Sequence, residues 1–146
     1  MGSHLTNTLT RVEVASGTKT IDVASSTIEM PYADSISFTL SSGAGTGTSP
    51  TMDVSMQWTP DDGTTWVQAP IKFAQVTTSA SVQMVTFRPN LGDNESAWTN
   101  AVATTGSAVA KNFVPSRKIR FYFDMGGTNP SFPTVIIYGA YQNRSV

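Results

Sequence analysis

The stretch from residue 52 to residue 70 constrains the fold most, because it predicts one β-hairpin. Met52, Val54, Met56 and Trp58 occupy every second position with polar residues between them, so one face of an extended strand is apolar. Residues 59–63 then combine a proline, two aspartates and a glycine, which is typical of a tight turn. The β-branched and aromatic residues after the turn predict the returning strand. The sequence therefore indicates an antiparallel β protein.

Other segments repeat this alternation of apolar and polar residues along the chain. We expect strands at residues 28–30, 36–40, 71–76, 81–87, 118–123 and 134–142, and a first hairpin from residues 7–15 and 18–23 that turns at Ser16 and Gly17. Residues 41–50 and 124–130 are rich in glycine and small polar residues and predict loops. Residues 89–106 lack a clear period, and a short helical turn is expected at residues 96–103.

Eight to ten strands joined by short turns predict an all-β fold, an antiparallel β-sandwich of jelly-roll type with long irregular loops. We expect one such domain over residues 11–146, preceded by a flexible N-terminal leader or arm at residues 1–10. The chain has 146 residues, which is enough for a core without cross-links, and its lack of cysteine excludes disulfides and thiolate metal sites.

Composition bears on the partners. Charged residues make up 13% of the chain and the net charge is -1, so nucleic acid is not an expected partner. No apolar run is long enough to predict a membrane span, and the N-terminus lacks the pattern of a secretory signal. Abundant serine and threonine are explained by β-propensity, or by strand surfaces that lie against another molecule and do without the lysines that usually protect sheet edges.

No set of residues predicts catalysis, a cofactor site or a metal site. The one histidine, His4, stands in the expected leader, so a histidine-based triad cannot be built. Asp61 and Asp62 are adjacent in a turn and point apart, which makes a poor glycosidase pair and a good turn. Residues 93–95, Asp-Asn-Glu, offer oxygen ligands but lack the alternating spacing of a calcium loop. We therefore expect a protein that is not an enzyme.

One octapeptide, Thr59-Pro60-Asp61-Asp62-Gly63-Thr64-Thr65-Trp66, is similar to the Asp-box, whose pattern is Ser/Thr-x-Asp-x-Gly-x-Thr-Trp. In sialidase propellers this motif recurs once per blade and is a structural hairpin. Here it occurs once, which argues against a sialidase. The resemblance implies a structural turn, whose residues are Thr59, Asp61, Gly63, Thr65 and Trp66.

The same phrase, together with the weakly charged strands and the segment Lys-Ile-Arg-Phe-Tyr-Phe at residues 118–123, resembles small all-β virion proteins of tailed phages. That resemblance implies a non-enzymatic cement or decoration protein. Such a protein is made in the host cytoplasm, binds the major capsid protein on the outside of the shell and commonly forms a homotrimer. A phage tail or baseplate protein fits the same features.

The candidate contacts are apolar or glycine-rich positions in the leader, the expected loops and the irregular region: Leu5, Leu9, Gly43, Gly45, Gly47, Trp98, Met125 and Phe132. An alternative from a different class is a carbohydrate-binding or adhesin module. It would use exposed aromatic rings for stacking, with Trp98 beside Asn94 and Asn100 as the leading candidate and Trp66 as another. Glycan binding would separate the two hypotheses.

Overall fold

The protein is described from a computed structural model, which describes residues 6–30, 35–87, 109–110 and 118–145. Their regular structure consists of antiparallel strands, and the predicted all-β antiparallel fold is confirmed. The strands are β1 (Thr6–Lys19), β2 (Val23–Ala24), β3 (Ile28–Glu29), β4 (Ser35–Ser42), β5 (Thr46–Trp58), β6 (Val67–Lys72), β7 (Ser81–Phe87), β8 (Val109–Ala110) and β9 (Lys118–Ser145).

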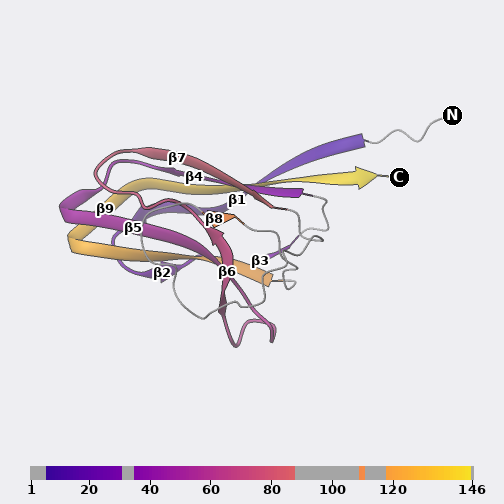
Figure 1. Cartoon of the computed structure of the whole chain (residues 1–146), viewed down its shortest axis with the longest axis horizontal. Coiled ribbons are helices and arrows are strands. Elements are labelled where there is room, and N and C mark those ends of the chain that lie inside the picture. Colours follow the sequence, from indigo (N-terminus) through magenta and orange to yellow (C-terminus); the bar gives the residue numbers. More distant parts are fainter. Residues whose placement is uncertain (1–5, 31–34, 88–108, 111–117, 146) are drawn as a thin grey trace.

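The strand β9, 28 residues long, organises the sheet (Figure 1). Its first part pairs with β2, β3 and β5, and its second part pairs with β1 and β4. The main strand order is β7-β4-β9-β5-β6-β8, so one sheet curls over into a half-barrel. Because β9 belongs to both sides, the two layers of the expected sandwich are joined through it. We call them the β7 layer (β1, β4, β7 and residues 132–145) and the β5 layer (β2, β3, β5, β6, β8 and residues 118–131).

The core lies between the two layers and follows the alternation in the sequence. In β4, Ile36, Phe38 and Leu40 are buried, and in β5 Met52 and Val54 are fully buried. Aromatic rings from different strands meet at the centre, where the ring centroids of Phe38 and Phe121 are 4.9 Å apart in an edge-to-face arrangement. The remaining buried apolar residues are Met56, Ala69, Ile71, Phe73, Val76, Val85, Ile119, Phe123, Phe132, Val135 and Ile137.

The predicted hairpin with a turn at Ser16 and Gly17 is wrong. β1 continues through both residues, and β9 is its pairing partner along its whole length. Gly17 has a φ of 111°, and the register shifts between Gly17 and Lys19. Glycine accepts such a positive φ in a β-bulge as readily as in a turn, so the same residue pair fits both structures. Here the bulge follows because β9 offers a continuous partner.

The two glycine-rich segments predicted as loops are also mostly strand, and they pair with each other. Thr46 lies opposite Ser131 and Thr48 opposite Thr128, with register shifts that absorb extra residues. Gly47 and Gly127 have φ values of 113° and 96° at these irregular positions. A Cβ on Gly47 would come within 2.5 Å of the Asn129 carbonyl oxygen. The glycines therefore allow two bulged strands to approach closely, and β9 bends beyond them, where it passes from the β5 layer to the β7 layer at residues 131–132.

Other predictions are placed as follows. The hairpin of residues 52–70 is confirmed as β5 and β6, with Trp58 opposite Val67. The expected leader overlaps β1, which begins at Thr6 and pairs with the end of β9. Residues 1–5, the expected helical turn at 96–103 and the acidic segment 93–95 lie outside the described residues.

Candidate functional site

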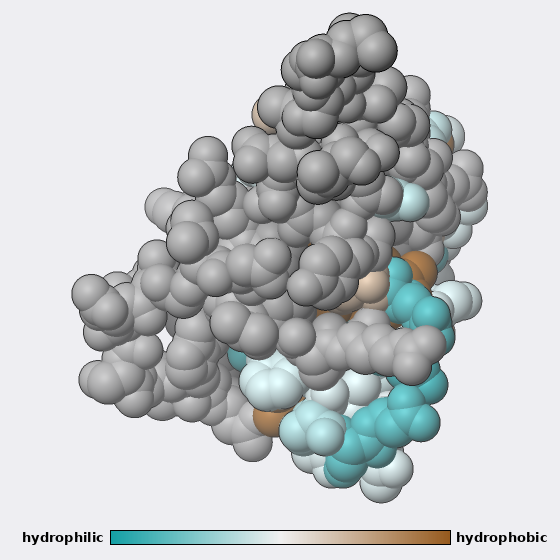
Figure 2. Space-filling view, turned by 90° about the vertical axis from the view of Figure 1, so that its right-hand side faces the viewer, coloured by the Kyte–Doolittle hydropathy of each residue, from teal (hydrophilic) through white to brown (hydrophobic). Residues whose placement is uncertain are grey.

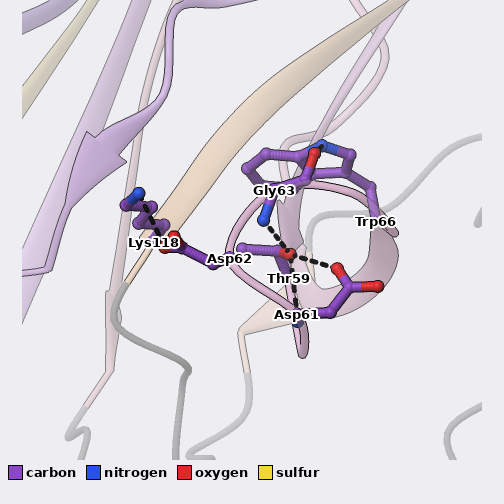
Figure 3. Close-up of polar contacts among 6 residues, drawn as sticks. All are labelled: Thr59, Asp61, Asp62, Gly63, Trp66 and Lys118. Carbon is purple, nitrogen blue, oxygen red and sulfur yellow. Dashed lines mark hydrogen bonds and ion pairs between the residues drawn. The ribbon is translucent and has the colours of Figure 1, made fainter.

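The turn between β5 and β6 is held together by one buried hydroxyl. Thr59 is 3% exposed, and its Oγ1 accepts hydrogen bonds from the backbone N–H groups of Gly63 at 2.7 Å and Asp61 at 3.4 Å (Figure 3). The same hydroxyl donates to Asp61 Oδ1 at 3.1 Å. That carboxylate oxygen in turn accepts the Thr65 N–H at 2.6 Å. The Asp-box-like residues therefore form a closed local network.

The two aspartates of this turn have different partners and do not form a catalytic pair. The hydrogen bonds from Thr65 lower the pKa of Asp61 below its ordinary value, which keeps this carboxylate charged as an acceptor. Asp62 has a φ of 62° and forms an ion pair with Lys118 Nζ at 2.7 Å (Figure 3). Asp62 thus ties the turn to the start of β9, whereas Asp61 closes the turn itself.

Trp66 ends the turn and lies against charged and polar groups. Its indole Nε1–H donates to the Gly63 carbonyl at 3.2 Å. The guanidinium carbon of Arg120 lies 4.3 Å from the ring centroid, and Arg120 Nε also donates to Gln57 Oε1 at 2.7 Å. These contacts give Trp66 a structural place between the turn and the outer side of the β5 layer.

The outer side of the β7 layer carries two of the large apolar side chains that are exposed among the described residues. Val82 and Met84 on β7 are 76% and 67% exposed, although both sit in a regular strand. The residues directly across from them on β4 are Ser41 and Thr39, and Thr86 lies opposite Ser37, with the two hydroxyl oxygens 2.7 Å apart. We call this set, Val82, Met84, Thr86, Ser37, Thr39 and Ser41, the β7 face. It contains two apolar side chains and four hydroxyls, and no charge.

The sequence predicted β7 as a strand, but it did not predict which side of the strand is exposed. Apolar residues fall on both faces of this strand, and the structure leaves Val82 and Met84 exposed while it buries Val85. The signal for a surface was present in the sequence as a strand of seven residues without a charge or a proline. Which of its faces lies outside depends on the pairing with β4.

Within the described residues, the candidate contact residues do not form one exposed surface. Phe132 is fully buried in the core, and Gly45 is buried where a Cβ would collide with the Phe132 ring. Gly43 packs close to Pro133, Gly47 lies at a bulge, and Met125 is partly buried against the core. Leu9 lies in β1 opposite Gln142. Leu5 and Trp98 lie outside the described residues.

An acidic corner, which we define as Asp22, Asp53 and Asp124, was not expected from the sequence. Asp53 on β5 lies directly opposite Asp124 on β9. Asp53 Oδ2 accepts a hydrogen bond from Gln75 Nε2 at 2.8 Å, but its Oδ1 is buried without a partner. Asp22 Oδ1 accepts the Met125 N–H at 2.7 Å. Burial first, and then the charges of Asp22 and Asp53, raise the pKa of Asp124.

The described part of the chain offers neither a metal site nor a membrane-spanning helix. There, no group of three or more histidine, aspartate or glutamate side chains is arranged to hold a metal ion, so the acidic corner is not such a site. Within the same residues, no helix has the length and apolar character needed to cross a membrane. Figure 2 shows the molecule from the side, and the described residues at the bottom of this view are largely hydrophilic. The β5–β6 hairpin ends at the same level in Figure 1.

The described residues form an antiparallel half-barrel. It has a hairpin turn held by local hydrogen bonds, and it exposes the β7 face, a set of residues without charge. Comparisons with known proteins found no match among family models, curated proteins or solved structures.

Proposed function

We propose that this protein is a non-enzymatic virion component that binds the outside of a phage capsid and stabilises it. The observation that carries the proposal is the exposure of Val82 and Met84, 76% and 67%, on a paired strand of the β7 layer. Large apolar side chains held open on regular structure favour a surface that another protein covers. The resemblance to tailed-phage virion proteins supplies the partner, the major capsid protein.

The chemistry of the β7 face suits a protein surface better than a charged ligand. Its hydroxyls can exchange hydrogen bonds with a partner's backbone or side chains, and the absence of charge in the set avoids the cost of burying an unpaired ion. Binding to the assembled shell and not to free subunits would stabilise the shell by mass action. A homotrimer would add avidity if each copy contacts a neighbouring capsid subunit.

Cosedimentation with particles of the phage that encodes the chain tests this proposal. Purified protein is mixed with heads that lack it and, separately, with purified tails, and the bound fraction and the temperature of genome release are measured. We expect binding to heads and release at a higher temperature. Binding to tails alone would favour the tail or baseplate alternative, and binding to neither particle would overturn the proposal.

Variants of the β7 face locate the contact. Val82→Ser combined with Met84→Ser should leave the fold intact, because both side chains are exposed, and should weaken head binding at least tenfold. Ile21→Ser is the matched control, since Ile21 is 70% exposed but lies between β1 and β2. Undiminished binding by the double variant would contradict a contact through this face.

The described residues do not favour the carbohydrate-binding alternative. Trp66 has Arg120 over its ring and its Nε1–H bonded within the turn, so it is not an open stacking platform. A glycan array with the purified protein would test this alternative independently of capsid binding.

A further inference from the structure

The acidic corner brings three carboxylates together beside the β5–β9 ladder. Asp53 and Asp124 are cross-strand partners, and side chains directly opposite in an antiparallel pair lie on the same face with Cβ atoms about 4.5–5.5 Å apart. Asp22 reaches the same place from the connection between β1 and β2, where it binds the N–H of Met125. Like charges placed opposite one another in a sheet repel, so this arrangement needs a compensating group.

The polar groups around the corner leave one acceptor unsatisfied. Gln75 satisfies Asp53 Oδ2, whereas the buried Oδ1 has no hydrogen-bond partner. A buried acceptor without a donor is costly, and a protonated carboxyl is a donor that a neighbouring aspartate can supply. Asp124, directly opposite, is the nearest carboxyl in the ladder.

The adjoining elements carry charged or titratable groups at Lys19, Lys72 and Tyr122. Lys19, at the end of β1, donates to the Ser16 carbonyl at 3.4 Å, and its Nζ lies 5.0 Å from the Phe123 ring centroid. Lys72 on β6 is opposite Ser55, the next residue after Asp53 on the same face of β5, and Tyr122 on β9 is also opposite Ser55. Burial and the charges of Asp22 and Asp53 all raise the pKa of Asp124, and so favour its neutral form.

We propose that Asp124 is protonated and donates to Asp53 Oδ1, and that this neutral carboxyl keeps the segment around Asp22 fastened to β9. With Asp124 protonated, its O–H donates to Asp53 Oδ1 and a single negative charge of the pair faces Asp22. When the proton leaves to solvent, three carboxylates repel one another. Asp22 is exposed and lies outside the strands, so it is the one that moves away and gives up the Met125 N–H.

The direction of the pH dependence follows from the folded state holding this proton more tightly than the unfolded chain. The contribution of Asp124 to stability is fully present below its unfolded pKa, near 3.8, and is lost as the pH rises through its raised folded pKa. The device therefore closes in acid and opens as the pH rises through the raised folded pKa of Asp124. It acts on the junction of β1, β2 and β9, independently of the proposed capsid binding.

Nuclear magnetic resonance on the full chain tests the proposal. The carboxyl carbon of Asp124 is titrated, and exchange of the Met125 amide is measured over the same pH range and corrected for its intrinsic pH dependence. We expect Asp124 to titrate above the ordinary aspartate range, and the protection of the Met125 amide to fall as Asp124 loses its proton. Titration in the ordinary range, or constant Met125 protection, would overturn the proposal.

Asp124→Asn provides the matched test, because an amide can donate to Asp53 Oδ1 at every pH. In this variant the Met125 amide should stay protected from exchange across the pH range, without the fall expected for the wild type. Asp62→Asn is the control, because it removes one carboxylate on the β5–β6 turn. It should keep the pH-dependent fall in Met125 protection seen in the wild type. An unchanged pH-dependent fall in Met125 protection in Asp124→Asn would contradict the role of the Asp124 proton. The wild-type titration decides the matter even if a variant fails to fold.

Discussion

At the scale of single residues, Thr59 does more than its position in a surface turn suggests. Its buried hydroxyl accepts from two backbone N–H groups and donates to Asp61. All these partners lie within a few positions in the sequence, which is why the turn could be predicted from the octapeptide alone. The acidic corner could not, because Asp53 and Asp124 become neighbours only through the β5–β9 register.

Replacing Thr59 with valine should destabilise the protein by about 1–3 kcal/mol, because the shape is kept while the Gly63 and Asp61 N–H groups lose their acceptor in a buried place. Urea unfolding monitored by tryptophan fluorescence measures the change. Thr64→Ala is the control, since Thr64 is exposed in the same turn, and its effect should stay within about 0.5 kcal/mol. Equal effects of the two substitutions would show that the network adds no stability.

At the scale of strands, alternation predicted the regular elements and failed where glycine interrupts them. Ile36, Phe38 and Leu40 are buried as expected. Glycine-rich segments, by contrast, are compatible with both loops and bulged strands, and long-range pairing decides between them. Gly47 and Gly127 belong to paired strands because β5 and β9 run alongside one another up to the bend.

Gly127→Ala should destabilise the protein more than Gly17→Ala. Both glycines have a positive φ, at 96° and 111°, so both substitutions strain the backbone by about 1 kcal/mol. Only at Gly127 would the new Cβ also meet backbone, 2.5 Å from the Ser49 carbonyl oxygen, whereas at Gly17 nothing lies within 4 Å. We expect a further loss of about 1–3 kcal/mol for Gly127→Ala in thermal and urea unfolding. A smaller loss than for Gly17→Ala would contradict close approach of the two strands.

At the scale of the whole molecule, the two ends of the curled sheet are linked by one amide side chain. Gln83 on β7 accepts the Ala74 N–H at 2.7 Å and donates to the Ala74 carbonyl at 2.9 Å, just beyond the end of β6. β7 and β6 lie far apart in the strand order, so this pair of bonds connects the β7 layer to the β5 layer. The sequence does not predict this contact, because Gln83 and Ala74 meet only when the sheet curls.

Gln83→Ala should cost about 1–3 kcal/mol, because both backbone groups of Ala74 lose a partner. Gln83→Glu should cost less than Gln83→Ala, since it still accepts from the N–H but cannot donate when charged. Urea unfolding provides the measurement, with Val82→Ala on the exposed side of β7 as the control. A Gln83→Ala protein as stable as the Val82→Ala protein would show that the layers are held by packing alone.

The place of β9 in the sheet has a consequence for synthesis. Its partners β1, β2, β3, β4 and β5 all precede it in the chain, and each presents one edge to it. A nascent chain that has not yet released this strand from the ribosome holds those partners with their edges unpaired. The sheet can therefore close only after β9 has left the ribosome, and chaperones that shield unpaired edges should matter most until then.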